Sequence, residues 1–196
     1  MARMPVSLSM DRAIVRGLFL GFLMAMSLAA LPARADEPDI VWQHRAFHGN
    51  VTVTANPLGI ESRTSFYLGR GFTAESIQTF ARSCGFSIGM HNAGSRPITT
   101  RLADWRAIGA DGRDVPFRQP AAWDADWERL GVPQAARIAF RWAQFQSENN
   151  FAPGDWIMGM AALKEVPAAP FRLVARYHDN KGDHEIVLDG LGCARD

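Results

Sequence analysis

Residues 84–90 read CGFSIGM, and every second side chain in this stretch is apolar. Because successive side chains of a β-strand point to opposite faces, Cys84, Phe86, Ile88 and Met90 would share one face. The turn-forming sequence HNAGSRP follows directly. The stretch therefore predicts a half-buried strand, and with it a mainly β protein.

Similar signals recur along the rest of the chain. Period-2 alternation and turn-forming clusters predict strands at 51–54, 63–72, 97–103 and 155–163, a hairpin over 105–117 that turns at Asp111-Gly112, and a terminal hairpin of 171–178 and 184–188. Many short strands separated by turns are typical of an antiparallel immunoglobulin-like β-sandwich. The Cys–Trp–Cys signature of antibody domains is absent, so this likeness concerns architecture and indicates no particular family.

One or two short helices are expected within this pattern. Thr73 is a suitable N-cap for a helix of about two turns. A second helix is predicted over 123–131, with Asp124 as N-cap and Gly131 as its stop. Residues 133–145 fit either a helical stripe or a strand, and the β-patterned segments on both sides favour the strand.

Residues 1–35 have the features of a secretory signal peptide. Two arginines precede Gly17–Leu31, an uncharged apolar run of 15 residues, and Ala33-Arg34-Ala35 fits the small-x-small cleavage rule. The run is shorter than the roughly 20 residues of a membrane-spanning helix, which argues against a retained anchor. We therefore expect a single mature domain at 36–196, located in the periplasm or secreted.

The charge balance excludes several function classes. The chain holds 21 Lys and Arg against 20 Asp and Glu; four arginines and one aspartate fall within the signal peptide, which leaves 17 against 19. The mature domain thus lacks the basic surface of a nucleic-acid binder and the polybasic patch of a membrane-surface protein.

The two cysteines, Cys84 and Cys193, predict a disulfide. An even cysteine count in an exported chain indicates a structural bridge, here closing a loop of about 110 residues. A redox dithiol would show a C-x-x-C spacing, which is absent, and a two-cysteine metal site is the remaining alternative. The bridge would tie the end of the chain to the strand at 84–90.

Two methionines in the sequence FAPGDWIMGM raise the question of a metal site. Met158 and Met160 would share a strand face, and thioethers are ligands for Cu(I). A copper site would also recruit Met90 and His91. Both faces of 155–163 are rich in apolar residues, however, which predicts a central buried strand whose methionines pack in the core. The packing interpretation is favoured, and no resident cofactor is expected.

The histidines of the terminal hairpin are expected to be structural. A turn over 180–183 would pair Asp179 with His184 and His178 with Glu185. The two histidines would then lie on opposite faces, each beside a carboxylate. His44 and His48 would share a face, and such a pair can hold a metal, if that segment were helical; in a loop their spacing says nothing.

Tryptophan is the most unusual residue, with six in the chain. Trp123 and Trp127 lie four apart on the expected helix, so both rings would lie on one side. They either close one end of the sandwich, which is favoured, or form an aromatic platform for a glycan or a partner protein. Arg137 and Arg141, with Arg70 and Arg106, could frame such a surface.

No catalytic motif accompanies these features. The nucleophile elbow G-x-S-x-G and the metalloprotease pattern H-E-x-x-H are both absent. The expected function is that of a non-catalytic exported accessory protein that binds another periplasmic protein or a glycan. The alternatives are a periplasmic copper chaperone and a glycan-binding module.

Overall fold

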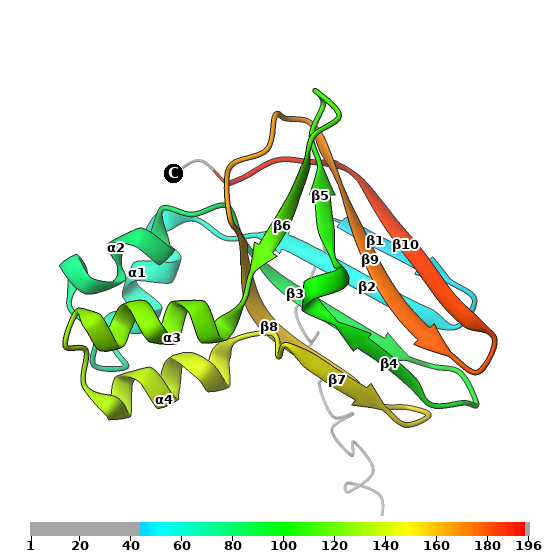
Figure 1. Cartoon of the computed structure of the whole chain (residues 1–196), viewed down its shortest axis with the longest axis horizontal. Helices are drawn as coiled ribbons and strands as arrows, with labels where there is room; N and C mark the ends of the chain where they lie inside the picture. The colour runs from blue at the N-terminus through cyan, green and yellow to red at the C-terminus, as the bar shows by residue number, and fades with distance from the viewer. Residues whose placement is uncertain (1–43, 195–196) are drawn as a thin grey trace, which may run out of the picture. The chain divides into compact units, whose positions relative to one another are not determined.

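The computed structural model describes residues 44–194 (Figure 1). The predicted signal peptide and its cleavage site lie outside the described residues. Within residues 44–194 the elements are β1 (His44–His48), β2 (Val51–Pro57), α1 (Ile60–Leu68), α2 (Ala74–Ala81), β3 (Gly85–Asn92), β4 (Ile98–Arg101), the 3-10 turn η1 (Leu102–Asp104), β5 (Arg106–Ile108), β6 (Asp114–Arg118), α3 (Pro120–Arg129), α4 (Gln134–Ala143), β7 (Glu148–Phe151), β8 (Trp156–Leu163), β9 (Phe171–Asp179) and β10 (Gly182–Leu191).

The ten strands described between residues 44 and 194 form one antiparallel sheet that does not close on itself, which confirms the predicted mainly β class. Their hydrogen-bonded order is β1-β2-β3-β8-β6-β5-β9-β4-β7, and β10 pairs with the other side of β9. Strand β8 is central, between β3 and β6, as predicted. The two predicted hairpins, β5–β6 and β9–β10, are both present.

Alternation along the strands decides which side chains enter the main core. In β3, Phe86, Ile88 and Met90 are buried, while the intervening side chains face outward. The core joins these residues to buried side chains of β2, β5, β6, β9 and β10. A one-residue slip of register would exchange the two faces of a strand, so this alternation fixes the register.

Four short helices pack together at one end of the sheet (Figure 1). Helices α1 and α2 connect β2 to β3, and α3 and α4 connect β6 to β7. A second core of mainly aromatic side chains holds them together: Tyr67, Phe72, Ile77, Phe80, Trp123, Trp127, Val132, Ala136, Phe140 and Ala162. Most of the ring pairs meet edge to face, the arrangement that aromatic quadrupoles favour.

The two helical hairpins follow the same plan, shifted by 60 positions. Gly71 and Gly131 both adopt positive φ, 88° and 68°, in the turn between the helices. Four buried positions match as well: Arg63, Tyr67, Phe72 and Phe80 in the first hairpin, and Trp123, Trp127, Val132 and Phe140 in the second. Only the glycine and the last phenylalanine are identical, so the structure reveals a repeat that the sequence does not.

The predicted strand at 63–72 is wrong, because this segment contains most of α1. The helix buries Arg63 and Tyr67, four positions apart and therefore on one face. Arg63 donates from Nη1 to the Phe80 carbonyl oxygen (2.9 Å) and to the Ser83 hydroxyl (3.2 Å), at the end of α2. Because one of the two buried positions is an arginine, the apolar residues of this segment do not show the spacing typical of a helix.

The favoured strand at 133–145 is also wrong, because the segment forms α4. Its buried residues, Ala136 and Phe140, are again four apart. Ile138 and Trp142, which produced the apparent alternation, are exposed. The preceding helix begins at Pro120, with Gln119 in place of Asp124 as N-cap, and Pro120 suits the first turn.

Other local predictions are confirmed. Thr73 caps α2 in a capping box with Ser76. Cys84 and Cys193 form the predicted bridge, with Cα atoms 5.1 Å apart, between the start of β3 and the end of β10. Such a bridge is typical of oxidising, non-cytoplasmic compartments. Across residues 44–194, no helix has both the length and the hydropathy needed to span a membrane.

Candidate functional site

The outward face of β1, β2, β3 and β8 carries large apolar side chains that contact solvent. Strand register places Phe47, Thr52, His91 and Trp156 in one row across the four strands. The next row holds Arg45, Thr54, Gly89 and Met158. We call these eight residues the open face. Phe47, Trp156 and Met158 are 75%, 69% and 50% exposed.

The helices cover the continuation of this same face. Met160 is partly buried against the helical core, and its Sδ accepts a hydrogen bond from the Tyr67 hydroxyl (3.6 Å). Ala162 is fully buried in the helical core. The outward face of β8 is therefore divided into a covered half and an open half.

The structure corrects the prediction that both methionines of β8 pack in the core. Met160 packs under α1, but Met158 belongs to the open face. Met90 is buried in the main core on the opposite side of β3, whereas His91 is exposed. Of the four suggested copper ligands, the fold leaves His91 and Met158 together on one accessible surface. They lie diagonally across β3 and β8, because His91 pairs with Trp156 and Gly89 with Met158.

The proposed aromatic platform at Trp123 and Trp127 is wrong. The two rings stack with centroids 5.7 Å apart, but they are only 2% and 0% exposed. Both belong to the helical core, and Arg118 covers Trp123 at 4.0 Å from the ring centroid. Their role is packing, as the favoured interpretation expected.

The arginines expected to frame the tryptophan platform do not gather around it. Arg137 bridges from Nε to Asp124 (2.9 Å) and from Nη1 to Glu128 (2.9 Å), which links α4 to α3. The hydrogen bond from Arg137 lowers the pKa of the Asp124 carboxyl below its ordinary value. Arg141 lies beside the exposed Trp142, and Arg106 pairs with Asp114 and Glu185 on the sheet.

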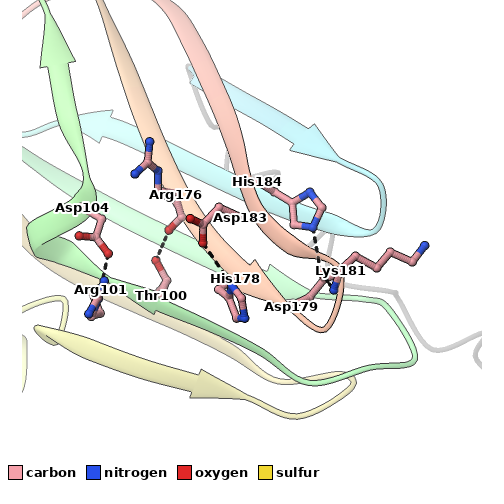
Figure 2. Close-up of polar contacts among 9 residues, drawn as sticks. All are labelled: Thr100, Arg101, Asp104, Arg176, His178, Asp179, Lys181, Asp183 and His184. Carbon is pink, nitrogen blue, oxygen red and sulfur yellow. Dashed lines mark hydrogen bonds and ion pairs between the residues drawn. The ribbon is translucent and has the colours of Figure 1, made fainter.

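A second, polar feature lies over the ends of β4, β7, β9 and β10 (Figure 2). A cavity of about 440 Å³ is lined there by Thr99, Thr100, Arg101, Asp104, Glu148, Asn149, Asn150, Arg176, Tyr177, His178 and Asp183. Most of its charged groups already pair with protein partners, as in Arg101–Asp104 (2.9 Å) and Arg176–Glu185 (2.8 Å). The Thr100 hydroxyl donates to the Arg176 carbonyl oxygen and accepts from Trp105 Nε1. We find no activated nucleophile among these described side chains.

The terminal hairpin turns two residues more tightly than predicted. Asp179 pairs with Gly182, so His178 faces Asp183 and His184 faces Tyr177. The expected pairing of Asp179 with His184 and of His178 with Glu185 is therefore wrong. The chemical expectation survives, since His178 Nδ1 lies 3.1 Å from Asp183 and His184 Nε2 lies 2.8 Å from Asp179 (Figure 2).

Sequence reasoning missed most of the open face. The residues around Phe47 show no strand pattern, and the apolar residues around Trp156 predict a strand that is buried on both faces. Their common row depends on the register of four strands, and period-2 alternation within one strand carries no such information.

Comparison with known proteins adds no family: no protein-family model matches the chain, and no curated protein matches its sequence. The function is therefore argued from the geometry alone.

Proposed function

We propose that this chain is a non-catalytic, exported module that binds a partner protein through its open face. The observation that carries the proposal is the exposure of Phe47, Trp156 and Met158 on one face of the sheet. Trp156 and Met158 are neighbours on one face of β8, and large apolar side chains gathered on an exposed face mark interaction surfaces. Tryptophan in particular is enriched among residues that dominate binding energy.

The open face also suits a particular kind of partner. Its centre is low, because Thr52, Thr54 and Gly89 lie between the large side chains of β1 and β8. Arg45 and His91 are its titratable side chains, and none of its eight residues is acidic. A protein surface with apolar groups to meet Phe47, Trp156 and Met158 and acidic groups to meet Arg45 and His91 would match this face in charge.

The location and the finer architecture belong to the same proposal. The signal-peptide features of residues 1–35 and the bridge of Cys84 to Cys193 support secretion into the periplasm or beyond. An immunoglobulin-like β-sandwich is supported by one core that joins side chains of β2 and β3 to those of β9 and β10. In such a sandwich the open face would be the outer surface of one sheet.

Photo-cross-linking in the cell that makes the protein tests the proposal. A photo-reactive amino acid at Thr52, in the centre of the open face, should give one discrete adduct with a second protein. Trp156→Ser should reduce this adduct at least 10-fold. The control is Leu130→Ser, because Leu130 is 62% exposed but lies in the α3–α4 turn, away from this face.

Three outcomes would contradict the proposal: no adduct at Thr52, an adduct of twice the chain's own mass, or equal loss in the Trp156 and Leu130 variants. The second outcome would mean that the open face binds another copy of the chain.

Copper handling is the second candidate, and one observation favours it. His91 and Met158 share the open face as diagonal neighbours, with Trp156 beside them. Imidazole and thioether groups bind Cu(I), and a tryptophan ring can lie against the cation. Competition with a chromogenic Cu(I) chelator should show one ion per chain, lost in both His91→Ala and Met158→Ala and kept in His178→Ala. Unchanged competition in the first two variants would exclude this function.

A further inference from the structure

Three turns of the sheet meet at the end opposite the helices (Figure 1). They are the β1–β2 turn at 49–50, the β3–β4 loop at 93–97 and the β9–β10 turn at 180–181. A cavity of about 380 Å³ is lined by residues of all three, among them Asn50, Ser95, Arg96 and Lys181. Turns that a rigid sheet holds in place are a common position for binding residues.

Hydrogen bonds tie the β3–β4 loop to both neighbouring turns. The Ala93 backbone N–H donates to the Asn50 carbonyl oxygen (2.9 Å). On the other side, Arg96 Nη1 donates to Asn180 Oδ1 (3.0 Å). The side chain of the buried Asn92 also donates to the Arg96 carbonyl oxygen (2.8 Å). The cavity wall is therefore ordered before a ligand arrives, which reduces the entropy that is lost on binding.

The cavity wall carries more positive than negative charge. Arg96 and Lys181 line it, and neither side chain forms an ion pair with a carboxylate of residues 44–194. Among the described lining residues, Asp179 alone carries a carboxylate. Its Oδ1 already accepts from the Lys181 backbone amide (2.7 Å) and lies 2.8 Å from His184 Nε2 (Figure 2). Two cations against one carboxylate leave a surplus of positive charge when the histidines are neutral.

This lining suits a phosphate group. The planar guanidinium of Arg96 can donate to two phosphate oxygens at once, and the Lys181 ammonium adds a point charge. The Asn50 amide and the Ser95 hydroxyl add neutral donors. Donors thus come from three turns around one cavity, as the oxygens of a tetrahedral anion require. A metal cation would instead meet two positive side chains.

We propose that the cavity lined by these three turns binds a phosphate group, either as free phosphate or as part of a larger molecule. Arg96 and Lys181 supply the charge, and Asn50 and Ser95 complete the set of donors. The cavity shares no residue with the open face. The proposal therefore stands or falls independently of the proposed function.

NMR titration of the exported chain with inorganic phosphate tests the site. Sodium chloride keeps the ionic strength constant, because general screening would affect every charged surface. The backbone amides of 49–50, 93–96 and 180–182 should shift together and saturate. Arg96→Gln and Lys181→Gln should each weaken binding by about 10-fold, the loss expected for a charge-assisted hydrogen bond. Arg96→Lys should lose less, because it keeps the charge but not the two-pronged contact.

Arg172→Gln is the matched control. Arg172 is an exposed cation on the same strand as the β9–β10 turn, but it lies near the opposite end of β9. Its loss changes the net charge of the chain by the same amount and should leave the phosphate affinity unchanged. Arg96→Gln keeps the backbone bond to Asn92, and unchanged amide signals outside the three turns will show that the variant is folded.

Sedimentation with vesicles of phosphatidylcholine and phosphatidylglycerol identifies the source of the phosphate group. Co-sedimentation that is lost in Arg96→Gln and Lys181→Gln indicates a lipid headgroup. Saturable shifts without co-sedimentation indicate free phosphate or a soluble phosphate ester. Shifts that do not saturate, phosphate affinity that is unchanged in both variants, or an equal loss of affinity in Arg172→Gln would overturn the proposal.

Discussion

Strand β8 passes through two environments on a single face. Met160 and Ala162 lie beneath the helices and are packed, whereas Trp156 and Met158 contact solvent. These residues share the same face of the same strand, so the helical cover is what separates the two halves. The comparison teaches that the apolar side chains of β8 stabilise the fold where the helices cover them, and that those outside the helical cover are free for the recognition proposed above.

The two halves should therefore respond differently to the same substitution. In the covered half, truncation removes contacts that the folded state alone possesses. In the open half, the side chain is hydrated both before and after unfolding, so truncation changes the free energy of unfolding little. The tryptophan, glycine and methionine predictions below each pair a packed residue with one from the open face.

The largest difference is expected between two tryptophans. Trp127→Ala should lower the free energy of unfolding by about 3–5 kcal/mol, because it empties a fully buried site among Phe72, Trp123 and Phe140. Trp156→Ala should change it by less than about 1 kcal/mol. Urea denaturation of both variants measures the difference. Similar losses would show that Trp156 is part of the core and that the open half is not open.

Tyr67 supplies the next largest effect. Its hydroxyl accepts from Gln144 Nε2 (2.8 Å) and donates to Met160, so Tyr67→Phe should cost about 1–3 kcal/mol by leaving the buried Gln144 amide without this partner. Denaturation near pH 7 measures this cost, and Tyr177→Phe, at the other end of the sheet, is the comparison.

Tyr67 should also shape the response to alkali. Burial raises the pKa of the Tyr67 hydroxyl well above its ordinary value of 10.0. The unfolded chain therefore ionises first, and stability is full below pH 10 and declines as the pH rises further. Tyr67→Phe should make this decline shallower. A slope identical to that of the parent chain would contradict the covered position of Tyr67.

Two glycines of the β3–β8 pair give a smaller contrast. A Cβ at position 159 would come too close to the backbone of Gln144 and Phe145, where the chain leaves α4, whereas at position 89 its close neighbour would be the Thr54 hydroxyl. Gly159→Ala should cost about 1–3 kcal/mol, because backbone must move. Gly89→Ala should cost less, because a threonine rotamer can give way. Thermal unfolding ranks the two, and the reverse order would mean that the register of β8 differs from the one described.

The sequence indicated the strands far better than it indicated the surface they create. Phe86, Ile88 and Met90 alternate with less buried residues because one face of their strand is buried in the core and the other is not. The helices were partly hidden, since Arg63 occupies a buried position and the repeat retains two identical residues. The open face depended on contacts between distant segments, such as His91 of β3 with Trp156 of β8, which no local pattern encodes.

The smallest effect is also the most informative about function. Met160→Ala should lower the free energy of unfolding by about 2 kcal/mol, the low end for a methionine in a packed site, because Met160 is only partly buried under Tyr67. Met158→Ala should lower it by about 0.5 kcal/mol or less, since half of this side chain is already exposed. Met158 and Met160 are neighbours on the same face of the same strand, so strand position and residue type are held constant.

Denaturation of both variants, combined with the cross-linking at Thr52, then separates stability from recognition. A Met158 variant that keeps its stability but loses the adduct places the function on the open face. If Met158→Ala instead lowers the free energy of unfolding as much as Met160→Ala does, Met158 is part of the packed core.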